Sequence, residues 1–159
     1  PFMWAASHFS VSAGATFISP RGSGAIGTGL PMAMGAKLAA PERDVICLEG
    51  DGGLMCGILS ELDTAAHHQL GITTIVFNNA TLGHERFNMR SGGEALDFGA
   101  GIDFATIARG LRCEGIRVER PEQIGPALDK ALENGRSGRP TVLDVQIHPN
   151  QYLRNPLGF

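Results

Sequence analysis

The amino-acid sequence predicts an α/β fold, in which a mainly parallel sheet carries helices on both faces. Apolar, β-branched runs that suit strands alternate along the chain with amphipathic stretches that suit helices. The chain has 159 residues, enough for one domain with a core of its own. Because it shows no internal repeat or linker, we expect one domain over residues 1–159, with an irregular arm or short helix at 1–14 and a tail at 149–159.

The first half of the chain combines helix stops with one buried strand. A helix of small residues should end at Pro41, because proline cannot continue a helix. The apolar run before Gly50 suits a buried strand, and Gly71 is a natural helix stop. In order, we expect a strand at 15–19, a glycine-rich turn at 21–29, a helix at 30–40, a strand at 44–49 and a helix at about 58–69.

The second half carries the clearest strand and the clearest helix start. Residues 73–77 form a β-branched, apolar run, and Asp103 can cap the helix that follows it. Pro121 suits a first helical turn, after which Ile124 and Leu128 are expected to face the core. In order, we expect a strand at 73–77, a loop at 80–101 with a short helix near 85–89, a helix at 103–112, a strand at 115–119, a helix at 121–134 and a strand at 141–147.

Composition and charge exclude several functional classes. The formal net charge is −3, from 13 basic and 16 acidic residues, which gives no broad positive surface for nucleic acid. The sequence has no long apolar run and no signal-peptide pattern at its start, so we expect no membrane association. Its three cysteines (Cys47, Cys56 and Cys113) form no CxxC pair, and we expect reduced thiols in a cytoplasmic protein.

Polar residues follow two of the expected strands at the points where those strands end. Gly50–Gly53, with Asp51 inside it, follows the strand at 44–49, and Asn78–Asn79 follows the strand at 73–77. In open α/β sheets ligands bind beyond the carboxyl ends of the strands, so Asp51 and Asn79 should meet if these strands are neighbours. A carboxylate with an amide oxygen suits Mg²⁺, completed by waters and ligand phosphates. The glycines allow backbone N–H groups to approach a phosphate.

The spacing of these residues also resembles a known family. A GDG sequence at 50–52 followed one crossover later by Asn78–Asn79 is similar to the signature of thiamine diphosphate enzymes. Residues 22–37 resemble a segment of acetolactate synthase and related 2-oxo acid decarboxylases. The resemblance extends over about residues 16–148. It implies the thiamine diphosphate-binding fold, usually the last of three domains in a longer polypeptide.

The resemblance implies a role for each matching residue. The side chains of Asp51 and Asn79 and the backbone carbonyl of Thr81 would bind Mg²⁺. Ile26 would be the apolar wedge that keeps the cofactor bent. The residues that would contact thiamine diphosphate are Gly24, Ala25, Ile26, Gly50, Asp51, Gly52, Gly53, Asn79, Thr81, Leu82 and Gly83.

The resemblance further implies an activity and a missing part. It implies a thiamine diphosphate- and Mg-binding subunit or domain of a 2-oxo acid decarboxylase or carboligase, acetolactate synthase-like. In this family the catalytic Glu comes from a different domain, and no residue of this sequence matches it, so we expect no catalytic residue here. The implied partners are a 2-oxo acid substrate and a pyrimidine-binding domain or subunit, in a homo- or hetero-oligomer.

Other interpretations of the same residues stay open. Asp51 and the two asparagines could each be plain turn residues. Residues 22–27 satisfy the GxGxxG dinucleotide fingerprint, which would indicate an NAD(P)-binding dehydrogenase domain. A non-catalytic cofactor-binding module or a fragment is a third interpretation. In the loop after Asn79, His84 and Arg86 are minor candidates for contact with a substrate, Arg86 through a carboxylate.

Overall fold

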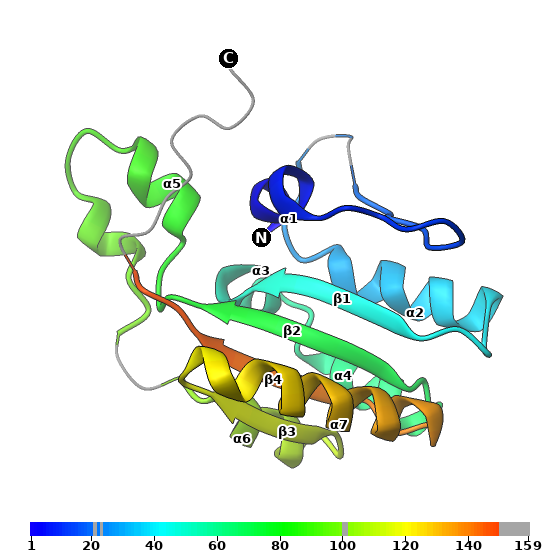
Figure 1. Ribbon diagram of the computed structural model, residues 1–159. Helices are drawn as coiled ribbons and strands as arrows, with labels where there is room; N and C mark the ends of the chain where they lie inside the picture. Colours follow the sequence, from blue (N-terminus) through cyan, green and yellow to red (C-terminus); the bar gives the residue numbers. More distant parts are fainter. Residues whose placement is uncertain (21, 23, 100–101, 150–159) are drawn as a thin grey trace.

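The computed structural model describes residues 1–20, 22, 24–99 and 102–149 (Figure 1). Within these residues the sheet has the strand order β1-β2-β4-β3, and each neighbouring pair is parallel. Its strands are β1 (Val45–Gly50), β2 (Ile72–Asn78), β3 (Glu114–Val118) and β4 (Thr141–Gln146). The predicted fold class is confirmed. Because all strands run the same way, their carboxyl ends share one edge of the sheet.

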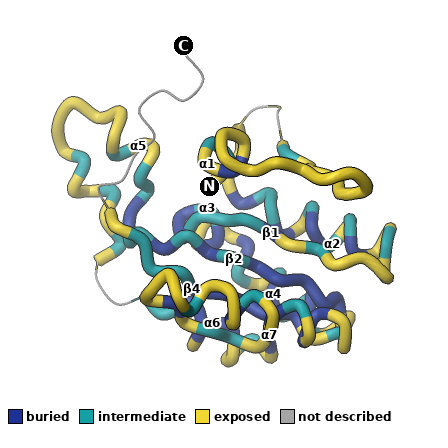
Figure 2. Tube along the Cα trace, in the orientation of Figure 1, coloured by how far each residue is buried: buried dark blue, intermediate teal, exposed yellow. Residues whose placement is uncertain are grey.

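Helices cover both faces of the sheet, as Figure 1 shows. Helices α2 (Gly29–Ala39), α4 (Ser60–His67) and α6 (Phe104–Gly110) enclose the larger apolar core, and α7 (Ile124–Arg136) covers the other face. Neighbouring residues of β4 alternate between the two cores, since Val142 belongs to the larger and Leu143 to the smaller. Figure 2 shows that the two central strands, β2 and β4, are mostly buried.

The remaining short elements lie mostly near the carboxyl edge of the sheet. They are the helices α1 (Phe2–His8), α3 (Asp51–Met55) and α5 (Gly83–Asn88), with the 3₁₀ turns η1 (Gly93–Leu96) and η2 (Pro121–Gln123). Pro1 contacts Gly50 at this edge, and the Gly14 carbonyl accepts a hydrogen bond from Arg43 before β1. Residues 1–14 therefore span the length of β1.

Three sequence-based expectations were wrong. Residues 15–19 form no strand, and Phe17 and Ile18 are exposed, because no neighbouring strand pairs with them. Asp51 begins a helix rather than lying in a loop. Ile124 is 45% exposed, because α7 turns small residues toward the sheet instead. One of them, Gly135, lies so close to Gly71 that a Cβ on Gly71 would overlap the Gly135 carbonyl.

Two of the expected segments lie partly outside the described residues. Most of the expected tail at 149–159, and two positions of the expected turn at 21–29, lie outside the described residues. None of the helices in the described ranges is long and apolar enough to cross a membrane.

Candidate functional site

Asp51 and Asn79 meet at the carboxyl edge of the sheet. β1 and β2 are paired with Gly50 opposite Phe77, so the residues that follow each strand emerge side by side. The backbone N–H of Asn79 donates to Asp51 Oδ2 at 3.1 Å, and Asp51 is 2% exposed. The structure therefore brings together the two polar groups that the sequence placed after separate strands.

The turn after β2 surrounds the Asp51 carboxylate with backbone donors. Gly52 N donates to Asp51 Oδ1 at 2.8 Å, and the N–H groups of Asn79, Ala80 and Thr81 also donate to this carboxylate. Ala80 has φ 58°, in the left-handed region that side chains other than glycine rarely adopt, and this strain turns the three N–H groups inward. Burial raises the pKa of Asp51, and these hydrogen bonds oppose the rise.

Three kinds of oxygen converge beside Asp51. As oriented, the side-chain oxygen of Asn79 faces only acceptors: it lies 3.2 Å from each Asp51 carboxylate oxygen and 2.9 Å from the Thr81 carbonyl oxygen. With the amide rotated, its nitrogen donates to all three oxygens, which is the orientation that the surrounding hydrogen bonds favour; with its oxygen there instead, a cation among the oxygens would be required. The donor set of carboxylate, amide and carbonyl oxygens is the one that Mg²⁺ prefers. Within the described residues, no three His, Cys, Asp or Glu side chains group as a metal site.

The glycines after β1 lie against the segment after β2. Gly52 is in the first turn of α3, and a Cβ there would overlap the side chain of Leu82. A Cβ on Gly53 would overlap the carboxylate of Glu49. Leu82 and Gly83, where α5 begins, therefore adjoin α3 closely. Gly52 and Leu82, two of the predicted cofactor contacts, thus lie against each other next to Asp51.

The segment at 24–26 approaches the same edge through the turn that follows it. Gly27 has φ +76°, and a Cβ there would lie 3.1 Å from the Gly53 carbonyl oxygen. Ile26, next to this contact, is 52% exposed. The turn that carries Gly24, Ala25 and Ile26 therefore rests on α3, with the large apolar side chain of Ile26 facing solvent.

Glu49 is a functional candidate that sequence reasoning missed. It accepts backbone hydrogen bonds from Gly27 and Gly29, and burial raises its pKa. The signal was a charged residue at the end of an otherwise apolar strand. Residues of this kind are rarely buried without partners.

Asp144 is a second missed residue, at the centre of a buried network behind the site. It is fully buried, and burial raises its pKa. Asn78 Nδ2 donates to Asp144 Oδ1 at 2.8 Å, and Phe104 N donates to Asp144 Oδ2 at 3.1 Å. Asn78 Oδ1 in turn accepts from Ala80 N at 3.3 Å. The network therefore supports the turn that surrounds Asp51.

A loop with a closed base follows Thr81. Thr81 pairs with Asp97 in an antiparallel bridge, Leu82 N donates to the Leu96 carbonyl at 3.1 Å, and Phe98 N donates to the Ala80 carbonyl at 2.8 Å. Arg86 forms an ion pair with Asp97 at 2.7 Å. The carboxylate that Arg86 binds is therefore one of this chain.

His84 lies on the exposed surface of α5, in the same loop. The side-chain amide of Asn88 lies 3.4 Å from His84 Nε2 and donates to the His84 backbone carbonyl at 2.9 Å. The contacts of both minor candidates for substrate binding are thus made within the loop itself.

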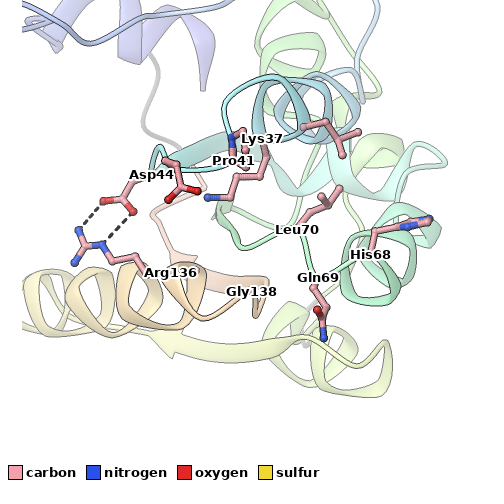
Figure 3. A pocket seen from close by; sticks show the side chains of 11 residues that line it. Lys37, Pro41, Asp44, His68, Gln69, Leu70, Arg136 and Gly138 are labelled. Atoms are coloured by element: carbon pink, nitrogen blue, oxygen red, sulfur yellow. Dashed lines mark hydrogen bonds and ion pairs between the residues drawn. The ribbon is translucent and has the colours of Figure 1, made fainter.

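A cavity lies at the opposite edge of the sheet (Figure 3). It has a volume of about 350 Å³ and is lined by residues that precede the strands, among them Lys37, Asp44, Gln69 and Arg136. Arg136 and Asp44 form an ion pair across it at 2.6 Å. None of the predicted site residues lines this cavity, and ligands of open α/β sheets bind at the other edge.

Comparison with known proteins agrees with this geometry. Residues 1–145 match the family described as thiamine pyrophosphate enzyme, C-terminal TPP binding domain. A probable acetolactate synthase large subunit of Methanococcus aeolicus is 35% identical over 155 residues, which are 95% of this chain and 25% of that protein. A sulfoacetaldehyde acetyltransferase of Alcaligenes xylosoxydans is 34% identical over 137 residues, 82% of this chain and 22% of the relative.

A solved structure is similar as well. The thiamine diphosphate-dependent 4-hydroxybenzoylformate decarboxylase of Rhodococcus jostii RHA1 superposes with a TM-score of 0.66 at 34% identity. The match covers 77% of this chain and 23% of that one. The chain thus spans about a quarter of the length of the proteins it matches.

Proposed function

Because the chain belongs to the thiamine pyrophosphate enzymes, as a C-terminal TPP binding domain, we propose that it holds thiamine diphosphate and Mg²⁺ at the carboxyl edge of its sheet. The observation that carries this proposal is that the Asn79 side-chain amide, the Asp51 carboxylate and the Thr81 carbonyl meet at one point. Mg²⁺ bound there would neutralise the diphosphate. Gly50, Gly52, Gly53, Leu82 and Gly83 would line the diphosphate, and Gly24, Ala25 and Ile26 the aminopyrimidine.

We further propose that the activity is decarboxylation or carboligation of a 2-oxo acid. Relatives named as acetolactate synthase and as a benzoylformate-type decarboxylase support this class. When bound, thiamine diphosphate supplies an electron sink for such chemistry. The residues of this chain bind and orient the cofactor, and a pyrimidine-binding domain or subunit would provide the catalytic Glu and complete an oligomeric enzyme.

Exposed apolar side chains near the site support a partner domain. Ile26 and Met55 are 52% and 42% exposed, and they belong to the turn and the helix that form the site. Covering them would exclude water from the bound cofactor. A dinucleotide site at 22–27 is disfavoured, because the Glu49 carboxylate already accepts the N–H groups at the start of α2, where a pyrophosphate would bind.

Titration calorimetry with thiamine diphosphate, with and without Mg²⁺, tests the proposal. We expect Mg²⁺-dependent binding that Asp51→Ala weakens at least about 100-fold, since even outer-shell changes at metal sites cost 10–100-fold. Asp129→Ala, at an exposed position of α7, should bind as the unsubstituted chain does. Metal-independent binding, or equal affinity in Asp51→Ala, would contradict the assignment. Native mass spectrometry would identify a co-purifying chain that supplies the missing domain.

A further inference from the structure

The Glu49 side chain lies between two segments that are distant in sequence. It emerges from the end of β1, and its carboxylate lies so close to Gly29 and Gly53 that a Cβ on either would overlap it. Gly29 opens α2 and Gly53 belongs to α3. Glycine at both positions therefore makes room for one carboxylate.

This carboxylate caps α2 from another element. The first N–H groups of a helix lack partners inside the helix and carry partial positive charge. Thr28, in the cap position of α2, makes no side-chain cap hydrogen bond. The Glu49 carboxyl instead accepts hydrogen bonds from the N–H groups of Gly27 and Gly29. The turn before α2 is thus bound to β1.

The same turn also rests on α3. The Gly53 carbonyl oxygen lies 3.1 Å from the Cβ position of Gly27, and the Ile58 side chain lies 3.5 Å from it. Glu49 therefore ties the segment carrying Gly24–Ile26 to the helix carrying Asp51 and Gly53. The first segment is the proposed aminopyrimidine surface, and the second is part of the proposed diphosphate surface.

We infer that Glu49 is a positioning residue that assembles the two halves of the cofactor site before the cofactor arrives. It acts through the backbone of Gly27 and Gly29 and holds the exposed Ile26 at a fixed distance from α3. This inference rests on the proposed function only for the identity of the ligand. The preassembly is a property of the unliganded chain and can be measured there.

The first test is amide hydrogen exchange of the unliganded chain. In Glu49→Ala the amides of Gly27 and Gly29 should exchange at least about tenfold faster, as expected for the loss of their hydrogen bonds to this side chain. Glu49→Gln keeps one acceptor oxygen in nearly the same shape and should restore part of the protection. Glu42→Gln removes a charge at the exposed opposite edge and should change nothing. Unchanged exchange at 24–29 in both Glu49 variants would overturn the inference.

The second test compares two ligands by calorimetry. Mg-pyrophosphate would contact only the Asp51 side of the site, whereas Mg-thiamine diphosphate would contact both halves. Glu49→Ala should weaken thiamine diphosphate about tenfold and pyrophosphate by less than about threefold, with partial recovery in Glu49→Gln. Equal weakening of both ligands would indicate a merely structural role and overturn the inference. If Glu49→Ala does not fold, the Glu49→Gln comparison decides.

Failure of the proposed function has a different signature. In that case the unsubstituted chain and Asp51→Ala would bind thiamine diphosphate equally or not at all. The exchange experiment would still separate Glu49→Ala from Glu42→Gln, because it needs no ligand.

Discussion

Replacing Asp144 by alanine should destabilise the fold by about 3 kcal/mol. The substitution removes the acceptor of two buried donors, Phe104 N at 3.1 Å and Asn78 Nδ2 at 2.8 Å. Each buried donor left without a partner costs about 1–3 kcal/mol. Asn78 Nδ2 keeps the Ile102 carbonyl at 3.1 Å, and the loss of a buried charge is favourable, so the total falls in the lower half of the combined range of about 2–6 kcal/mol.

Urea denaturation followed by circular dichroism measures this change. The midpoint should fall while the slope stays the same, which identifies a change in stability rather than in compactness. Asp129→Ala on the exposed side of α7 is the matched control and should stay within about 0.5 kcal/mol. A loss below about 1 kcal/mol for Asp144→Ala would refute the argument that this carboxylate satisfies two buried donors.

The sign of the pH dependence follows from the raised pKa of Asp144. Its pKa is raised by burial, more than the hydrogen bonds from Asn78 and Phe104 lower it. The carboxyl therefore takes up its proton at a higher pH in the folded chain than in the unfolded chain. The resulting stability is full below the ordinary Asp pKa and is lost as the pH rises through the raised one. The penalty of Asp144→Ala should thus be larger near pH 4 than at pH 7.

Three other predictions concern separate parts of the chain. Asp103 accepts a hydrogen bond from Thr106 N at 2.8 Å, which lowers the pKa of Asp103. Asp103→Ala should therefore lower the free energy of unfolding by about 1 kcal/mol at pH 7. In urea denaturation at a series of pH values, this difference should vanish as the pH falls through the lowered pKa. Ala80→Gly should raise the free energy of unfolding, and with it the urea midpoint, because it relieves a left-handed φ of 58°. The expected gain in free energy is about 0.5–1 kcal/mol. Among the cysteines, exposed Cys56 should react first with a thiol reagent monitored by absorbance, while Cys47, whose pKa burial raises to about 12, should react only on unfolding.

Each of these three predictions has a contrary result. A pH-independent effect of Asp103→Ala would mean that the carboxylate does not act as a cap in the folded chain. An unchanged or lower midpoint for Ala80→Gly would show that the turn after β2 is not strained. Reaction of Cys47 at the same early rate as Cys56 in the native chain would contradict the burial of Cys47.

Local patterns in the sequence predicted the elements whose signals are local. The β-branched run at 73–77 is β2, and Asp103 caps α6 as expected. The meeting of Asp51 with Asn79 also followed from sequence, because parallel neighbours bring their carboxyl ends together.

The failures arise where tertiary contacts decide. Residues 15–19 have strand-like composition, yet a strand needs a partner that the sequence does not reveal. The role of Glu49 depends on glycines about twenty residues upstream. Its position at the end of an apolar strand therefore did not reveal where the carboxylate points. The left-handed Ala80 is held by hydrogen bonds to Asp51 and Asn78, both invisible to local propensity.

The closed base of the loop after β2 has an evolutionary consequence. The bridge between Thr81 and Asp97 and the bond from Phe98 N to Ala80 fix the ends of the loop at the edge of the sheet. What lies between, including α5, can change in length or composition without moving the Thr81 carbonyl. Insertions there carry a low entropic cost. Such a loop can diversify under selection for new substrates while the residues beneath it keep their places, and it offers protein engineers a natural position for grafting sequence.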